Sequence, residues 1–346
     1  MSSGVDAAAS PFDIYPCGSP SCDLLSSNPM LWRMITLNTL TTRVENMYQP
    51  HYSRKLINAL CGGLLIQGVL LSAAFCKEYT GEVLDASSAI LTLGAGDSAS
   101  DITVRGGKLY LQEDASSSGC RILSAGSEMH VTQRASSKGT DVKLSGSQFV
   151  SDHASDEAAV ISSGGLQYVS GDATVKDTVI SGTGTQFLSE RAQGKGIRID
   201  SAGYLYLTDD ASIEGVVMSG DNAALDMTNN TRAVKTRVQD GVHTIRGSAS
   251  SSDLRVQQNG YVALNDQAIA QDVTLEKGGS LSLFDADAQA EDVIIKQGGV
   301  MKIFAGKARN ITVQAGGVLR LYPRAQVSSL TVEVGGQVLR SPPTQD

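Results

Sequence analysis

The sequence predicts an all-β protein: a right-handed parallel β-helix of about 14 coils over residues 77–340. Three observations predict it: a glycine-rich turn recurs about every 19 residues, apolar residues alternate on both sides of each turn, and bulky side chains are scarce. Glycine accounts for 36 of 346 residues and aromatic residues for 5%, with Trp32 the single tryptophan. This composition suits thin repeated coils better than the interior of a large globular enzyme.

The recurring turn is marked by the second glycine of a GG-like pair, or by the residue that replaces it. Successive markers are 18, 19 or 20 residues apart along the whole series. Asn222 is a sensible replacement, because asparagine accepts the positive φ that a tight turn demands. The predicted markers are Ser88, Gly107, Gly126, Gly146, Gly165, Gly184, Gly203, Asn222, Gly241, Gly260, Gly279, Gly299, Gly317 and Gly336.

Strand-like segments flank each turn. Two apolar residues alternate before it and two alternate after it, which places one face of the strand inside and the other in solvent. Around Gly126 and Asn222 the apolar pairs slip by one residue, so the register there stays open. The pairs after the turn include Leu109/Leu111, Leu205/Leu207, Val262/Leu264, Leu281/Leu283, Met301/Ile303 and Leu319/Leu321, and the slipped pairs are Met129/Val131 and Leu225/Met227.

The central coils are more polar than the rest. Gln148, Gln167 and Gln186 occupy positions where other coils have leucine or valine. Equivalent glutamines one coil apart predict a ladder of side-chain amides. The same spacing predicts a stack of three rings, Phe149, Tyr168 and Phe187.

Ahead of the repeats, residues 56–76 form an apolar run that follows Arg54 and Lys55 and ends in small residues. This pattern is typical of a secretory signal peptide and predicts one apolar helix, with a membrane anchor as the alternative. Residues 1–55 are interpreted as a disordered or misassigned leader, with Met1 or Met47 as the start, and residues 341–346 as a tail.

No candidate catalytic, cofactor-binding or metal-binding residue emerges. Four of the five cysteines precede residue 77, no CxxC pair exists and the histidines are scattered, which argues against zinc. The formal charge of −8 disfavours nucleic acid as a partner. Acidic clusters weighed as a sugar-cleaving site were interpreted instead as turn formers, and His243 as structural. The clusters are Asp209-Asp210 (with Asp266 at an equivalent place), Asp285/Asp287, Glu291-Asp292 and Asp152/Asp156/Glu157.

The segment ISSGGLQYVSGDATVKDTVISGTGTQFLS, residues 161–189, resembles the 19-residue repeats of AIDA-type autotransporter adhesins. The resemblance implies a β-helical passenger exported to the bacterial cell surface or the extracellular space, and glycosylation on repeat serines and threonines in some members. It implies adhesion, aggregation or biofilm formation as the function. Implied partners are host or bacterial cell-surface glycans or proteins, or further copies of the chain. An outer-membrane translocator is expected but is not encoded here.

The sequence therefore predicts an exported, non-catalytic surface rod. Two alternatives stay open. One is a polysaccharide-acting β-helix enzyme, and the other is a truncated autotransporter fragment without independent function.

Overall fold

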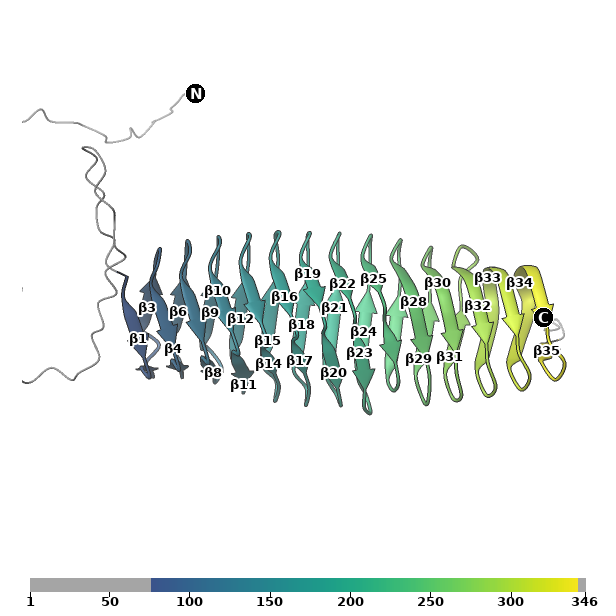
Figure 1. Ribbon diagram of the computed structural model, residues 1–346, viewed down its shortest axis with the longest axis horizontal. Coiled ribbons are helices and arrows are strands. Elements are labelled where there is room, and N and C mark those ends of the chain that lie inside the picture. The colour runs from purple at the N-terminus through teal and green to yellow at the C-terminus, as the bar shows by residue number, and fades with distance from the viewer. Residues whose placement is uncertain (1–75, 342–346) are drawn as a thin grey trace, which may run out of the picture. The chain divides into compact units, whose positions relative to one another are not determined.

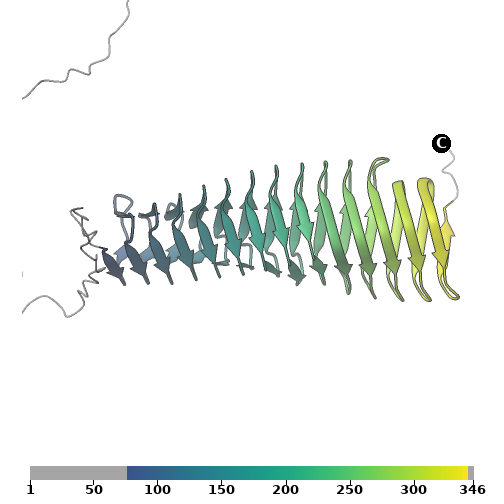
Figure 2. The same ribbon diagram turned by 45° about the horizontal axis from the view of Figure 1, so that its top comes forward.

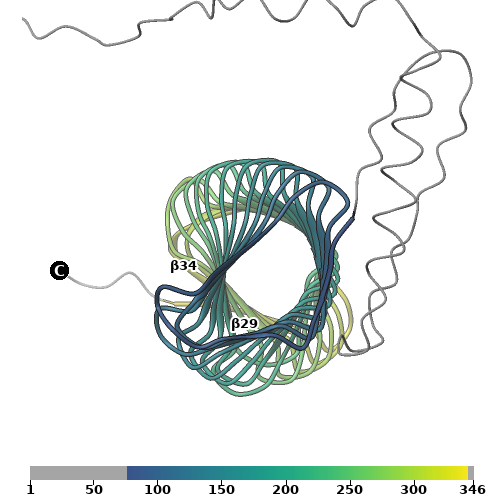
Figure 3. The same ribbon diagram turned by 90° about the vertical axis from the view of Figure 1, so that its left-hand side faces the viewer.

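The computed structural model describes residues 76–341, which form a parallel β-solenoid of about 14 turns without a helix. The predicted fold class is confirmed at this level. The coils are stacked along one axis (Figures 1 and 2), and the view along that axis shows them overlaid with a progressive rotation (Figure 3). No helix in the described residues is long and apolar enough to cross a membrane. The leader, the signal-like segment up to residue 75 with its predicted helix, and the tail beyond Ser341 lie outside the described residues.

Each coil contributes strands to three faces, and every strand pairs in parallel with its equivalent in the next coil. The first face follows the glycine turn and contains β3 (Ile90–Leu93), β6 (Lys108–Leu111), β9 (Glu128–Val131), β12 (Ser147–Val150), β15 (Leu166–Val169), β18 (Thr185–Leu188), β21 (Tyr204–Leu207), β24 (Ala224–Met227), β27 (Val242–Ile245), β29 (Tyr261–Leu264), β31 (Ser280–Leu283) and β35 (Gln337–Arg340).

The second face contains β1 (Glu78–Thr80), β4 (Ser98–Ser100), β7 (Ser116–Ser118), β10 (Ser136–Lys138), β13 (Ser155–Glu157), β16 (Thr174–Lys176), β19 (Gln193–Lys195), β22 (Ser212–Glu214) and β25 (Arg232–Val234). The third contains β2 (Val83–Leu84), β5 (Thr103–Val104), β8 (Arg121–Leu123), β11 (Asp141–Lys143), β14 (Val160–Ile161), β17 (Val179–Ile180), β20 (Arg198–Asp200), β23 (Val217–Ser219) and β26 (Arg237–Val238). Further along, β28 (Ser250–Val256), β30 (Ile269–Leu275) and β32 (Gln289–Ile295) join these two faces, and β33 (Val300–Val313) and β34 (Val318–Val332) run through all three.

The core lies inside the coils, where the alternating apolar residues form continuous columns. Leu109 and Leu111 are fully buried, and so are their equivalents Met129 and Val131 one coil later. Leu225 and Met227 likewise pair with Leu205 and Leu207. The register that the sequence left open is therefore regular. Because one coil cannot bury its inner face alone, stacking supplies the burial.

Three predicted turn markers are wrong by one residue. Register pairing places Ala89, Ser127 and Ala223 in the column of Gly107, Gly146 and Gly203, so Ser88, Gly126 and Asn222 each precede it. Coils of 18 and 20 residues sit next to each other at these points and shift the turn without shifting the strands. The error came from taking the glycine or asparagine, and not the apolar pairs, as the ruler.

The two positions of the turn have different requirements. The first takes positive φ, as at Gly164 (78°) and, as predicted, Asn222 (62°). The second needs space, because the coils approach closely there. A Cβ atom on Gly146 would lie 2.6 Å from the carbonyl oxygen of Ile122 in the preceding coil. At this second position glycine is therefore needed because only a hydrogen atom fits between the two backbones.

Candidate interaction surfaces

Acidic residues at one corner form a ladder that binds the coils to each other. Asp285 Oδ2 accepts a hydrogen bond from the backbone N–H of Asp266 at 2.8 Å, and Asp266 Oδ2 accepts one from Gly247 at 3.1 Å. Asp209 and Asp152 do the same for the coils before them, accepting from the backbone N–H groups of Glu190 and Gln133. These carboxylates therefore form turns, as expected, and they also satisfy backbone donors across coils.

The remaining acids weighed as catalytic candidates have basic or amide partners. Glu157 lies between Lys138 and Lys176, at 3.4 and 3.6 Å. Glu291 contacts Arg309 at 2.8 Å and Asp287 contacts Lys307 at 3.3 Å. Asp210 and Asp292 accept hydrogen bonds from the side-chain amides of Asn230 and Asn310. These pairs belong to a coil-to-coil network of exposed charges.

Asp156 differs from the other acids because it is inside the core. Its Oδ1 accepts hydrogen bonds from Ser137 Oγ at 2.5 Å and Gln148 Nε2 at 3.1 Å, and its Oδ2 accepts one from Gln167 Nε2 at 2.8 Å. Burial raises the pKa of this carboxyl above its ordinary value, against the opposing effect of the three donors.

The predicted amide ladder is present beside it. Gln167 Nε2 donates to Gln148 Oε1 at 2.8 Å, and Gln186 Nε2 donates to Gln167 Oε1 at 2.5 Å. All three glutamines are fully buried. The polar centre of the rod is therefore internal and is not a ligand site.

We expect Asp156→Val to change how stability depends on pH. Above its ordinary pKa of 3.8 the unfolded carboxyl ionises, whereas the buried native carboxyl keeps its proton until its raised pKa is reached. Stability of the native chain is therefore lost as pH rises through this window, by about 1.4 kcal/mol for each pKa unit. Urea titrations of both chains from pH 4 to 8 should show the variant gaining relative to the native chain and then levelling off. Parallel curves would contradict the assignment.

His243 is also buried, as a structural member of the core. Its Nδ1 lies 3.2 Å from the carbonyl oxygen of Leu225, and its Nε2 has no hydrogen-bond partner. Burial lowers its pKa from 6.5 to about 4. The neutral ring fills a position in the column of Leu225 and Val262.

A column of stacked rings runs along the outside of the first face. The predicted stack of Phe149, Tyr168 and Phe187 is confirmed, with ring centroids 5.2 and 5.0 Å apart. It extends further than predicted, through His130 to Tyr110, at 4.7 Å per step. The rings are half-buried and lie face to face, so mainly their edges meet solvent.

The stack turns at β21. The ring of Tyr206 lies at 70° to Phe187, and the Tyr204 hydroxyl donates to Asp226 Oδ2 at 3.0 Å. Arg246 lies 3.7 Å from the same oxygen. Burial, followed by the charge of Asp226, raises the pKa of the Tyr204 hydroxyl. Sequence analysis missed this cluster, although aromatic residues at the repeat spacing before and after the predicted stack were a usable signal.

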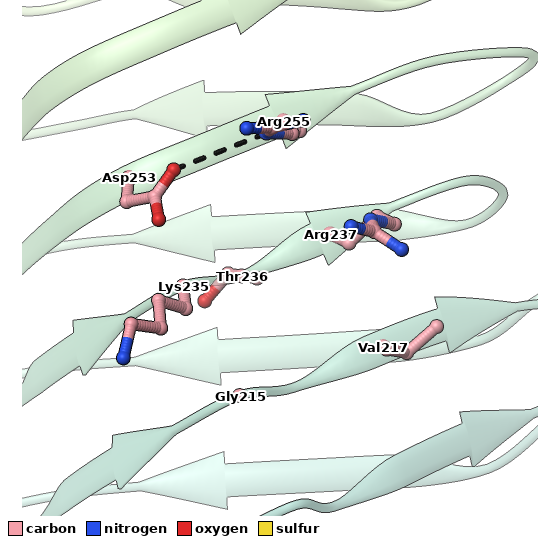
Figure 4. A pocket seen from close by; sticks show the side chains of 7 residues that line it. All are labelled: Gly215, Val217, Lys235, Thr236, Arg237, Asp253 and Arg255. Atoms are coloured by element: carbon pink, nitrogen blue, oxygen red, sulfur yellow. Dashed lines mark ion pairs between the residues drawn. The ribbon is translucent and has the colours of Figure 1, made fainter.

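A shallow groove of about 300 Å³ crosses the rod between β23, β26 and β28 (Figure 4). Arg237 and Arg255 are register partners there, and Arg255 lies 3.9 Å from Asp253. Lys235 extends away from Arg237 (Figure 4) and contacts Glu214 at 2.7 Å. The groove therefore does not gather its cations around one point. Among residues 76–341, no three histidine, cysteine or acidic side chains are grouped as metal ligands.

Comparison with known proteins gives one kind of relationship. No family model and no curated protein matches the sequence. The structure is similar to the crystal structure of a fragment of TibA, an autotransporter adhesin passenger, that was hyper-glycosylated by TibC. The TM-score is 0.52 at 18% sequence identity, over 77% of this chain and 97% of that chain.

The likeness to TibA is one of fold. It bears out the resemblance to autotransporter passengers that residues 161–189 predicted, at the level of a shared β-solenoid. Adhesion and glycosylation belong to TibA, and for this chain they are matters of proposal.

Proposed function

We propose that this chain is the rod of an exported surface protein that acts in adhesion, aggregation or biofilm formation without catalysing a reaction. The observation that carries the proposal is the solenoid fold shared with the TibA passenger fragment over nearly all of that fragment. The acidic candidates support a non-catalytic role, because they hold backbone donors, basic side chains or side-chain amides. The partners would be cell-surface glycans or proteins, or other copies of the chain, met repeatedly along the rod.

The second face supports a further part of the proposal. Its outward positions contain serine or threonine in successive coils, and these hydroxyls are partly or fully exposed. They are suitable acceptors for sugars of the kind carried by the TibA fragment. The outward residues are Ser98, Ser100, Ser116, Ser118, Ser136, Ser155, Thr174, Ser212, Ser250 and Ser252.

Fractionation of the source cells tests the proposal. We expect mature protein that begins near residue 75 or 77, is removed by protease added to intact cells, and restores cell aggregation to a deletion strain. Intact mass would show added sugars if the second face is glycosylated. Full-length protein confined to the cytoplasm, with normal aggregation in the deletion strain, would contradict the proposal.

A further inference from the structure

Charge is unevenly distributed along the rod. The whole chain has a formal charge of −8, yet residues 296–341 contain seven basic residues and one acidic residue, Glu333. The last coils therefore carry a net charge of +6 within an acidic protein. The basic residues are Lys296, Lys302, Lys307, Arg309, Arg320, Arg324 and Arg340.

Some of these cations are neutralised and some are not. Lys296, Lys307 and Arg309 form ion pairs with acids of the preceding coil, at 3.2, 3.3 and 2.8 Å. Lys302 and Arg320 form no ion pair with any described residue. They are direct register partners on β33 and β34, where neighbouring strands lie about 4.8 Å apart. Like charges placed opposite each other destabilise a sheet, so this pair costs stability that nothing nearby recovers.

Aromatic rings flank the two cations. Phe304 and Tyr322 follow them two residues later on the same strands, and their ring centroids are 4.3 Å apart. Phe284 continues this stack one coil earlier, at 5.1 Å. From β27 to β35 the strand segments of the first face contain no acidic residue. We define the basic–aromatic block as Lys302, Phe304, Arg320 and Tyr322.

We propose that the basic–aromatic block binds an anionic polysaccharide. Successive acidic sugars are separated by about the width of a sugar ring, which is similar to the strand spacing between Lys302 and Arg320. The apolar edges of the stacked rings offer contact for the C–H faces of the sugars. Nucleic acid suits the block less well, because its bases stack on exposed ring faces and these rings cover each other. A membrane surface suits it less well too, because the rings are half-buried and do not project.

This inference narrows the proposed partners to one ligand class and one place on the rod. It rests on the proposed function only for its biological role. Binding is measured on purified protein, so its failure leaves surface display untouched, and failure of surface display leaves the binding result standing.

The test is calorimetric titration of the full chain with polygalacturonate, and with neutral dextran as the uncharged probe. We expect binding to polygalacturonate alone, weakening as ionic strength rises. The double variant Lys302→Gln/Arg320→Gln should bind at least about tenfold more weakly. Lys302→Arg keeps the charge and should bind like the native chain.

The matched control is Lys138→Gln/Arg198→Gln. It removes the same two charges from cations that are ion-paired with Glu157 and Asp200. We expect its affinity to stay within about twofold of the native value. Equal losses in both double variants, no binding of polygalacturonate by the native chain, or tighter binding to single-stranded DNA or anionic lipid vesicles would overturn the proposal.

Discussion

Gly165→Ala is expected to lower the free energy of unfolding by about 3 kcal/mol. The added Cβ atom would meet the carbonyl group of Val142 and the backbone nitrogen of Lys143 in the preceding coil. Both contacts are backbone atoms held by the parallel ladder, so neither moves aside as a flexible side chain would. The coils must separate locally, which also weakens the core beneath them. Urea denaturation followed by circular dichroism measures the loss.

Gly126→Ala is the matched control. Gly126 has a φ of 81° and no heavy atom within 4 Å of the position a Cβ would take. Its replacement should cost about 1 kcal/mol, from backbone conformation alone. Equal losses in the two variants would show that close approach between coils is not what the second glycine of the turn provides.

His243→Leu is expected to remove a stability loss of about 3 kcal/mol between pH 6.5 and pH 4. Burial lowers the pKa of the native ring to about 4 from an ordinary value of 6.5. Between these values the unfolded chain binds a proton that the native chain does not, so native stability falls as the pH falls. Leucine suits the position, because the neighbouring coils place Leu225 and Val262 there.

The difference between the native and His243→Leu unfolding curves isolates this residue. The variant should gain relative to the native chain as the pH falls from 6.5, opposite in direction to Asp156→Val. His153→Gln is the control, because His153 is exposed and its ring lies outside the core. A pH-independent difference for His243→Leu would contradict the burial of a neutral ring.

The architecture was predictable because coils repeat the same physical requirement. Leu109 and Leu111 alternate for the same reason as Leu319 and Leu321, and fourteen repetitions make the pattern unmistakable. The internal amide ladder and the ring stack followed from spacing alone, because register pairing in a solenoid brings equivalent residues together. Turn markers failed at Gly126 and Asn222, where coil lengths of 18 and 20 residues compensate for each other.

The contacts beyond the repeat were not predictable from spacing. Asp156 meets Gln148 within its own coil, eight residues away, because both side chains point into the same narrow interior. Tyr204 reaches Asp226 diagonally, 22 residues away, because its side chain leans across the next coil. Side-chain direction decides both contacts, and the period does not encode it. The basic–aromatic block was visible in sequence as residues, but its meaning depends on which cations lack acidic partners.

Electron–electron distance measurements between spin labels test the parallel stacking most directly. With native cysteines replaced, labels would be placed at Lys138 and, in turn, at Glu214, Gln271 or Ser328. Register pairing places these four, seven and ten coils from Lys138 on the second face. At about 4.8 Å per coil, the expected separations are about 19, 34 and 48 Å, before allowance for label length. Distances that do not increase linearly with the number of coils would contradict the account.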